Sequence, residues 1–240
     1  MTALQTISFH HEGADLLGQL AIPSGRGPHP AVLVMHNALG LGHHMRDVAR
    51  RLAEQGYIAL ASDMYGGGVT HKDSQGAAAS MMPLMRNPAL LRARIIAWYE
   101  HMKTLPGVDA SRAGAIGYCF GGQCVLELAR SGADAKAVVS YHGLLTTALK
   151  AEPGAVKAYV AAYTGARDPY APYNDVQALR EELLTGGAAW QITEFGEVYH
   201  AFTDPDANIQ PIPGLAYDPL ADKVSWAGTL ALLESLVKGA

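Results

Sequence analysis

One cysteine of the sequence has the surroundings of a catalytic nucleophile. Cys119 lies in the stretch GAIGYCFGG, with Gly117 two residues before it and Gly121 two residues after it. Apolar residues typical of a buried strand precede the cysteine, and a helical pattern follows it. A nucleophile on a sharp strand-to-helix turn brings the two elements so close that side chains at the flanking positions would clash. The spacing therefore predicts that the Cys119 sulfur stands beside the first N–H groups of a helix, which stabilise a thiolate or an oxyanion.

The second cysteine is expected to play a different part. Cys124 lies five residues after Cys119, inside the predicted helix and beside apolar neighbours. Free cysteines are among the most buried residue types, so we predict a core position for Cys124, and burial is also the alternative for Cys119. Two cysteines so close together make no disulfide framework, and a chain without one is expected in the cytoplasm.

Two further residues stand where the partners of such a cysteine are needed. A thiol nucleophile needs a base, and the base needs a group that orients it. Asp168 opens the loop after a predicted strand over 157–163, and His200 follows one over 190–195. Taken singly, the aspartate before Pro169 could be a turn residue and the histidine a solvated side chain. The order nucleophile, acid, histidine, with each residue after a strand, predicts instead a Cys–His–Asp arrangement.

The elements around these residues alternate between strands and helices. We predict strands over 4–9, 15–22, 31–36, 57–62, 113–118, 137–142, 157–163 and 190–195, and helices over 45–55, 89–105, 120–131, 175–185 and 221–237. Residues 63–88 are predicted to be irregular, with one short helix. Five alternations of strand and helix indicate an α/β fold with a mostly parallel sheet and helices on both faces. No linker or repeat interrupts the chain, so we predict a single domain over 1–240.

Local signals set the ends of several elements. The first two strands are expected to form a hairpin that turns at 11–13. Gly56 is a suitable residue to follow the end of a helix, and Asn174 is a good cap for the start of one. The polar–apolar alternation of WQITEF, residues 190–195, predicts a strand near the edge of the sheet.

The composition limits the classes of partner and cofactor. The net charge of −4 argues against a nucleic-acid-binding surface. There is no run of about 18 apolar residues and no secretory signal, so we expect no membrane span. His36, His43 and His44 do not have the spacing of metal ligands, and no cysteine or carboxylate set completes a site. The run of glycines over 66–68 lacks the register of a nucleotide-binding loop, so we predict no cofactor.

Several motifs resemble the dienelactone hydrolase family of α/β-hydrolases. These are GYCFGG, GARDPYAP and YHAF, together with HNALGL and DMYGGG, and the resemblance covers nearly the whole chain. It implies an α/β-hydrolase fold in which Cys119 is the nucleophile, His200 the general base and then acid, and Asp168 the group that orients the imidazole. It also implies that the backbone N–H groups of Ala38 and Phe120 form the oxyanion hole.

The sequence departs from the family at residues that bind substrate. Members that cleave dienelactone carry a glutamate where this chain has Asn37, and an arginine four residues past the histidine, where it has Asp204. Arg86 could supply a second arginine of the family, or could be a surface residue. An aspartate near the mouth repels anions, so we expect an uncharged ester or lactone as substrate. Without the glutamate, we expect Cys119 to rest as a thiolate paired with the imidazolium of His200.

Several other residues are predicted around the pocket, although packing in the upper core is an equal alternative for the aromatic ones. They are His36, Asn37, Tyr65, Arg86, Tyr118, Tyr141, His142 and Phe202. The predicted function is hydrolysis of a small ester or lactone through a thioester acyl-enzyme, by a monomer or small homo-oligomer. The alternative is a non-catalytic or acyl-trapping binding protein on the same fold. A thiol oxidoreductase is disfavoured because no C-x-x-C motif is present.

Overall fold

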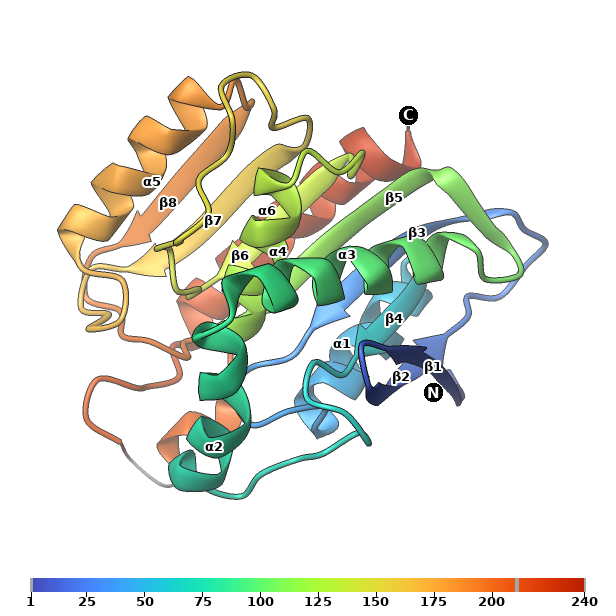
Figure 1. Ribbon diagram of the computed structural model, residues 1–240, viewed down its shortest axis with the longest axis horizontal. Helices are drawn as coiled ribbons and strands as arrows, with labels where there is room; N and C mark the ends of the chain where they lie inside the picture. Colours follow the sequence, from blue (N-terminus) through green and yellow to red (C-terminus); the bar gives the residue numbers. More distant parts are fainter. Residues whose placement is uncertain (1, 210–211, 240) are drawn as a thin grey trace.

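A computed structural model of the chain describes residues 2–209 and 212–239, and its centre is one eight-stranded sheet (Figure 1). The strand order is β1-β2-β4-β3-β5-β6-β7-β8. The pairs β1–β2 and β2–β4 are antiparallel, and the remaining pairs are parallel. The strands are β1 (Leu4–His11), β2 (Ala14–Ala21), β3 (His29–Met35), β4 (Ile58–Ser62), β5 (Val108–Tyr118), β6 (Ala137–Tyr141), β7 (Tyr159–Gly165) and β8 (Trp190–Phe195).

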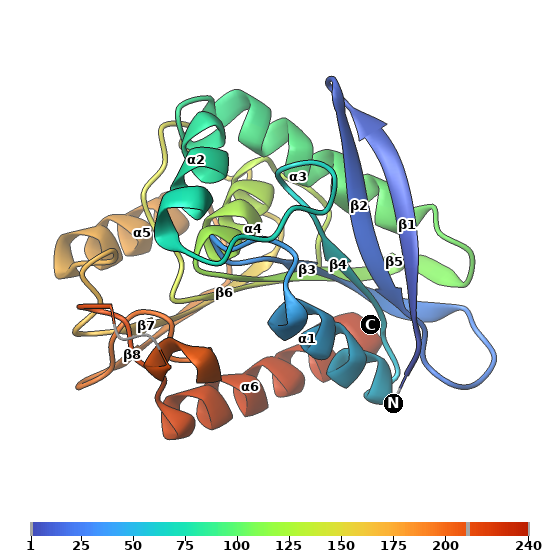
Figure 2. The ribbon, with the colours of Figure 1, turned by 90° about the horizontal axis from the view of Figure 1, so that it is seen from below.

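Helices cover both faces of this sheet. They are α1 (His43–Glu54), α2 (Ser74–Met85), α3 (Pro88–Lys103), α4 (Phe120–Arg130), α5 (Tyr173–Thr185) and α6 (Pro219–Leu233), with a short 3₁₀ helix at Pro205–Asn208 and a π-helical end at Glu234–Lys238. Figure 2 shows α1 and α6 on one face and α2, α3, α4 and α5 on the other. Two apolar cores result, one between each layer of helices and the sheet. The mostly parallel α/β architecture predicted from the sequence is confirmed.

Burial along the strands follows their place in the sheet. All residues of β4 and of β6 are buried, as expected for central strands covered on both faces. β8 is only partly buried and lies at the edge, which confirms the prediction from its alternating pattern. Because β3 to β8 run in parallel, the loops that follow their carboxyl ends meet along one edge of the sheet.

The local signals were right at some ends and wrong at others. Gly56 follows the end of α1 with φ of 91°, the left-handed conformation that glycine adopts readily. The cap predicted at Asn174 is wrong, because α5 already begins at Tyr173. The carbonyl of Pro172 accepts the N–H groups of Asp175 and Val176, which starts the helix before the asparagine.

The segment over 63–88 is more regular than predicted. It contains α2, a helix of 12 residues whose first turn is capped by the carboxylate of Asp73 on the N–H of Gly76, at 2.8 Å. Only Ala77 and Leu84 of this helix are fully buried. An apolar stripe is therefore almost absent, and periodicity could not reveal the length of the helix.

Candidate active site

Cys119 lies at the turn between β5 and α4. Its φ of 55° and ψ of −115° are uncommon for a residue with a side chain and mark local strain. Two hydrogen bonds hold this conformation: its N–H donates to the carbonyl of Tyr141 at 3.0 Å, and its carbonyl accepts the N–H of Gly122 at 2.9 Å. The turn leaves the side chain partly exposed at the N-terminal end of α4.

The glycines around Cys119 are required by close backbone contacts. A Cβ on Gly117 would lie 2.0 Å from the carbonyl oxygen of Gly121, and a Cβ on Gly121 would lie 2.3 Å from that of Met35. Both distances are far below the closest approach of real Cβ atoms, about 3.0 Å. The structure thus agrees with the steric reason that the sequence suggested for this spacing.

Asp168 and His200 form a buried pair beside the cysteine. His200 Nδ1 and Asp168 Oδ2 are 2.8 Å apart, and each residue is only 3% exposed. The other carboxylate oxygen of Asp168 accepts the N–H of Tyr170 at 2.8 Å, and the Tyr170 ring packs against the imidazole at 4.9 Å. The two residues follow the adjacent parallel strands β7 and β8, and His200 is close enough to Cys119 for each to shift the pKa of the other. The structure therefore brings the three predicted side chains together.

The electrostatics of this group favour an ionic pair. Burial alone would raise the pKa of Cys119, but the charge and hydrogen bond of His200 and the N–H groups of Ala38 and Phe120 lower it below its ordinary value. Burial would likewise lower the pKa of His200, but the charge of Cys119 and the hydrogen bond of Asp168 raise it to about 10. Cys124 is fully buried and its pKa is raised, mainly by burial, in agreement with the predicted core position.

Two backbone N–H groups from distant parts of the chain lower the pKa of Cys119. Phe120 N–H belongs to the first turn of α4, and Ala38 N–H belongs to the loop between β3 and α1. Tyr65 Oη donates to the Ala38 carbonyl at 2.9 Å. Asn37 Oδ1 accepts the N–H of the residue two positions on, Leu39, at 2.9 Å. These two bonds hold the loop that presents Ala38.

The other predicted pocket residues differ in their exposure to solvent. Tyr65 is half-buried above Phe120, with ring centroids 5.8 Å apart. Arg86 is exposed at the end of α2, where it is the C-terminal cap residue. Tyr118 and Phe202 are almost fully buried, at 2% and 0% exposure, in agreement with the alternative of packing in the core.

A cluster of buried aromatic rings lies next to His200. Tyr118 stacks on Tyr141 with ring centroids 4.6 Å apart. His142 contacts His200 edge to face at 5.0 Å and Phe202 at 5.1 Å. His142 is fixed by a hydrogen bond of 2.8 Å between its Nε2 and Thr203 Oγ1. These rings limit the positions that the His200 imidazole can adopt.

Asp63 is a site residue that the sequence analysis missed. Its fully buried carboxylate accepts the N–H groups of Tyr65, Gly66 and Gly68 at 2.7 to 3.1 Å. It thereby orders the glycine-rich loop that carries the Tyr65 hydroxyl to Ala38. An aspartate just before a run of glycines is a turn signal and could have indicated this role.

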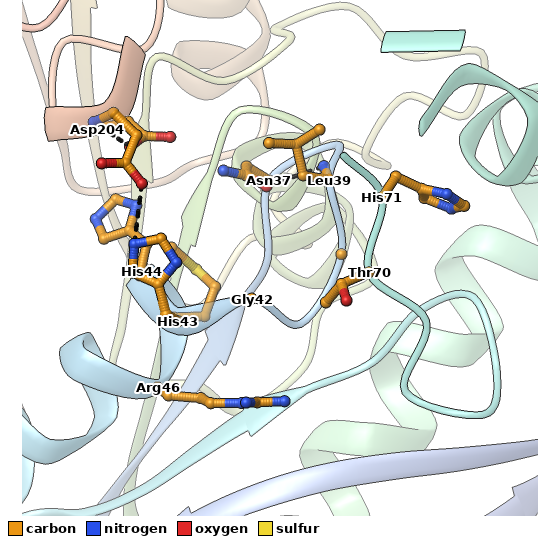
Figure 3. A pocket seen from close by; sticks show the side chains of 12 residues that line it. Asn37, Leu39, Gly42, His43, His44, Arg46, Thr70, His71 and Asp204 are labelled. Carbon is orange, nitrogen blue, oxygen red and sulfur yellow. Dashed lines mark hydrogen bonds and ion pairs between the residues drawn. The ribbon is translucent and has the colours of Figure 1, made fainter. Parts of the chain in front are cut away.

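A cavity of about 310 Å³ opens beside the loop of Asn37 (Figure 3). One wall is acidic, with Asp204 and Asp206, and His43 Nε2 pairs with Asp206 at 3.0 Å. Figure 3 shows Asp204 close to the histidines at the start of α1, with Arg46 set apart from them. Asp204, predicted near the mouth, thus lines a cavity that adjoins the oxyanion loop.

The described residues, 2–209 and 212–239, offer neither a cluster of metal ligands nor a membrane-spanning helix. No group of three or more histidine, cysteine, aspartate or glutamate side chains in this part of the chain could hold a metal ion. None of its helices is long and apolar enough to cross a lipid bilayer.

Comparison with known proteins places the chain in a family. The dienelactone hydrolase family model matches residues 16–237. The solved structure of a "dienelactone hydrolase-like promiscuous phosphotriesterase" from metagenomic libraries is 34% identical, with a TM-score of 0.92 over 98% of both chains. A "putative dienelactone hydrolase" from Klebsiella pneumoniae is 25% identical, with a TM-score of 0.81 over 98% of this chain and 99% of that one. A "putative carboxymethylenebutenolidase" from Yersinia pestis is 27% identical over 83% of this chain and 81% of its own. The chain therefore belongs to the dienelactone hydrolase family.

Proposed function

We propose that this hydrolase uses Cys119 as a nucleophile to cleave carboxylic esters or lactones through a thioester acyl-enzyme. The proposal rests on one arrangement: the His200–Asp168 pair at 2.8 Å lies beside the cysteine, whose pKa is lowered by His200 and by the N–H groups of Ala38 and Phe120. A nucleophile, a base with its orienting acid, and two oxyanion donors are the parts that acyl transfer requires.

In the acylation step, the thiolate of Cys119 attacks the carbonyl carbon of the substrate. The carbonyl oxygen becomes an oxyanion and accepts the N–H groups of Ala38 and Phe120. The imidazolium of His200 gives its proton to the leaving alcohol oxygen as the C–O bond breaks. A thioester and a neutral imidazole remain, and Asp168 keeps the imidazole in the orientation that this transfer needs.

In the deacylation step, the neutral His200 takes a proton from water. The hydroxide formed attacks the thioester carbonyl, and the same two N–H groups bind the second oxyanion. Collapse of this intermediate releases the carboxylic acid and expels the sulfur as a thiolate. The thiolate–imidazolium pair is thereby restored, so no proton or electron is gained or lost by the protein over a full cycle.

The charges near the site favour an uncharged substrate. Asn37 carries no charge, and its oxygen is already bonded to the N–H of Leu39. Asp204 and Asp206 line one wall of the cavity next to it, so a carboxylate placed against that wall would be repelled. We therefore propose neutral esters and lactones as the substrate class.

The test is the time course of p-nitrophenyl acetate cleavage by the wild type and by Cys119→Ala. The proposal expects a burst of one nitrophenolate per active site and then steady turnover, both absent in the variant. A burst without turnover would instead support the acyl-trapping binding protein. A wild-type trace equal to that of the variant, with lactones as well as esters, would overturn the proposal.

Phosphotriesters are a second candidate class. The metagenomic relative, 34% identical, is named a promiscuous phosphotriesterase, and its fold matches over 98% of this chain. Phosphotriesters are uncharged and form an oxyanion when a nucleophile attacks phosphorus, so the same donors could serve them. Release of p-nitrophenolate from paraoxon by the wild type but not by Cys119→Ala is expected, and equal traces would exclude this class.

A further inference from the structure

The proposed second oxyanion donor, Ala38 N–H, belongs to a peptide group whose carbonyl oxygen is hydrogen-bonded to a buried histidine. Ala38 N–H helps to lower the pKa of Cys119, and the carbonyl of the same peptide unit is that of Asn37. This carbonyl accepts a hydrogen bond of 2.6 Å from Nδ1 of His36 and a longer one, of 3.1 Å, from the backbone N–H of Gly40. A trans peptide is planar, with C=O and N–H pointing in opposite directions, so a fixed oxygen also fixes the direction of the N–H.

The hydrogen bonds of His36 determine which nitrogen bears its proton. Nε2 accepts the backbone N–H of Met64 at 3.0 Å and must therefore be unprotonated. A neutral imidazole has one donor and one acceptor, which assigns the proton to Nδ1, the nitrogen that faces Asn37. Burial lowers the pKa of His36 and so keeps the ring in this neutral form.

The surroundings of His36 leave the ring little freedom. It is 0% exposed and packs beside Tyr65 and Phe120, at centroid distances of 4.7 and 6.0 Å. The position of Met64 is set by its neighbours: Asp63 orders the following loop, and the Met64 carbonyl accepts Arg94 Nη1 at 2.7 Å. The histidine is thus held between the loop after β4 and the oxyanion loop.

We propose that His36 is a positioning residue of the oxyanion hole, which holds the Asn37–Ala38 peptide so that Ala38 N–H points at the reacting carbonyl oxygen. The inference rests on the proposed hydrolase function. A hydrogen bond to the peptide oxygen also polarises the N–H at the other end and strengthens its donation to an oxyanion. The same N–H also stabilises the resting thiolate, so the positioning role is tested where the thiolate is already formed and charge develops on the substrate oxygen.

Two amide variants separate the two hydrogen bonds of His36. The amide group of asparagine occupies the place of Nδ1, so His36→Asn keeps a donor for the Asn37 carbonyl and loses the acceptor for Met64. The longer glutamine places its amide near Nε2, so His36→Gln keeps the contact with Met64 and loses the donor. Both variants retain a polar side chain, and thermal melts of both establish that they fold.

Each variant is assayed in two reactions of Cys119. Hydrolysis of p-nitrophenyl acetate forms an oxyanion, whereas alkylation by iodoacetamide, at a pH where the thiolate is fully formed in every variant, does not. Loss of one oxyanion donor costs about 10²- to 10³-fold in rate, and misalignment costs part of that. For His36→Gln we expect kcat/KM for the ester to fall roughly 10- to 100-fold, mainly through kcat, with alkylation within about threefold of wild type. His36→Asn is expected to stay within about threefold in both reactions.

The outcomes distinguish the failure of this inference from failure of the proposed function. Equal ester rates in the two variants, or a parallel fall of ester hydrolysis and alkylation in His36→Gln, would overturn the role of His36 while the wild type remains an esterase. A wild type without Cys119-dependent ester cleavage would overturn both. Selective loss in His36→Gln supports the positioning role.

Discussion

The ionic pair between Cys119 and His200 can be tested by removal of one of its two charges. We expect Cys119→Ser to lower the pKa of His200, because serine keeps a similar size and hydrogen-bonding capacity but stays neutral. Burial disfavours the imidazolium, so its pKa of about 10 depends first on the charge of Cys119 and then on Asp168. A pKa of about 10 instead of 6.5 corresponds to roughly 5 kcal/mol in favour of the imidazolium.

The size of the expected change follows from the loss of one opposite charge. Such a charge at close range typically moves a pKa by about 1 to 3, so His200 in Cys119→Ser is expected to titrate at roughly 7 to 9. The assay is an NMR titration of ring-labelled histidine, with His200 assigned among the ten histidines through His200→Gln. The amount by which the pKa of His200 in this variant still exceeds its ordinary value reports the contribution of Asp168. A wild-type His200 that titrates near its ordinary value, or a variant that still titrates near 10, would refute the ionic pair.

Three further predictions concern Asp168, the turn between β5 and α4, and the cavity beside Asn37. Asp168→Asn is expected to lower kcat/KM for p-nitrophenyl acetate by about 10²- to 10⁴-fold and to move the alkylation midpoint of Cys119 to higher pH; an unchanged midpoint would contradict the coupling. Gly121→Ala is expected to lower the free energy of unfolding by about 1–3 kcal/mol or more, since its Cβ would lie 2.3 Å from a carbonyl oxygen. Gly196→Ala is the matched control for thermal melts, because a Cβ there meets nothing within 4 Å, and equal losses of Tm would contradict the steric reasoning. Asp204→Arg is expected to raise kcat/KM for a carboxylate-bearing ester relative to a neutral one by roughly 5- to 50-fold at low salt, and a ratio that does not change would show that this residue does not face the substrate.

The residues at strand ends could be predicted from the sequence because their signals are local. Gly117 and Gly121 mark the strand-to-helix turn at Cys119. Asp168 and His200 each follow a recognisable strand. Parallel strands bring such loops to one edge of a sheet whatever the details of packing. The position of Ala38 came from the family resemblance, since a backbone donor leaves no mark of its own in the sequence.

The supporting contacts could not be predicted, because they join distant parts of the chain. His36 and Met64 are 28 residues apart, and nothing in either segment reveals that an imidazole nitrogen accepts that N–H. Tyr118 and Phe202 are apolar enough for a pocket or a core, and only the packing of their rings distinguishes the two. The cap predicted at Asn174 was wrong because α5 begins one residue earlier, at Tyr173, so Asn174 lies inside the helix.

The contrast between the two cysteines has a consequence for the redox chemistry of the protein. A partly exposed sulfur with a lowered pKa, as in Cys119, is the form of cysteine that peroxides oxidise fastest to a sulfenic acid. Cys124 is not placed to resolve that product by forming a disulfide, because it is fully buried inside α4. If Cys119 is oxidised in this way, we expect its recovery to depend on an external thiol.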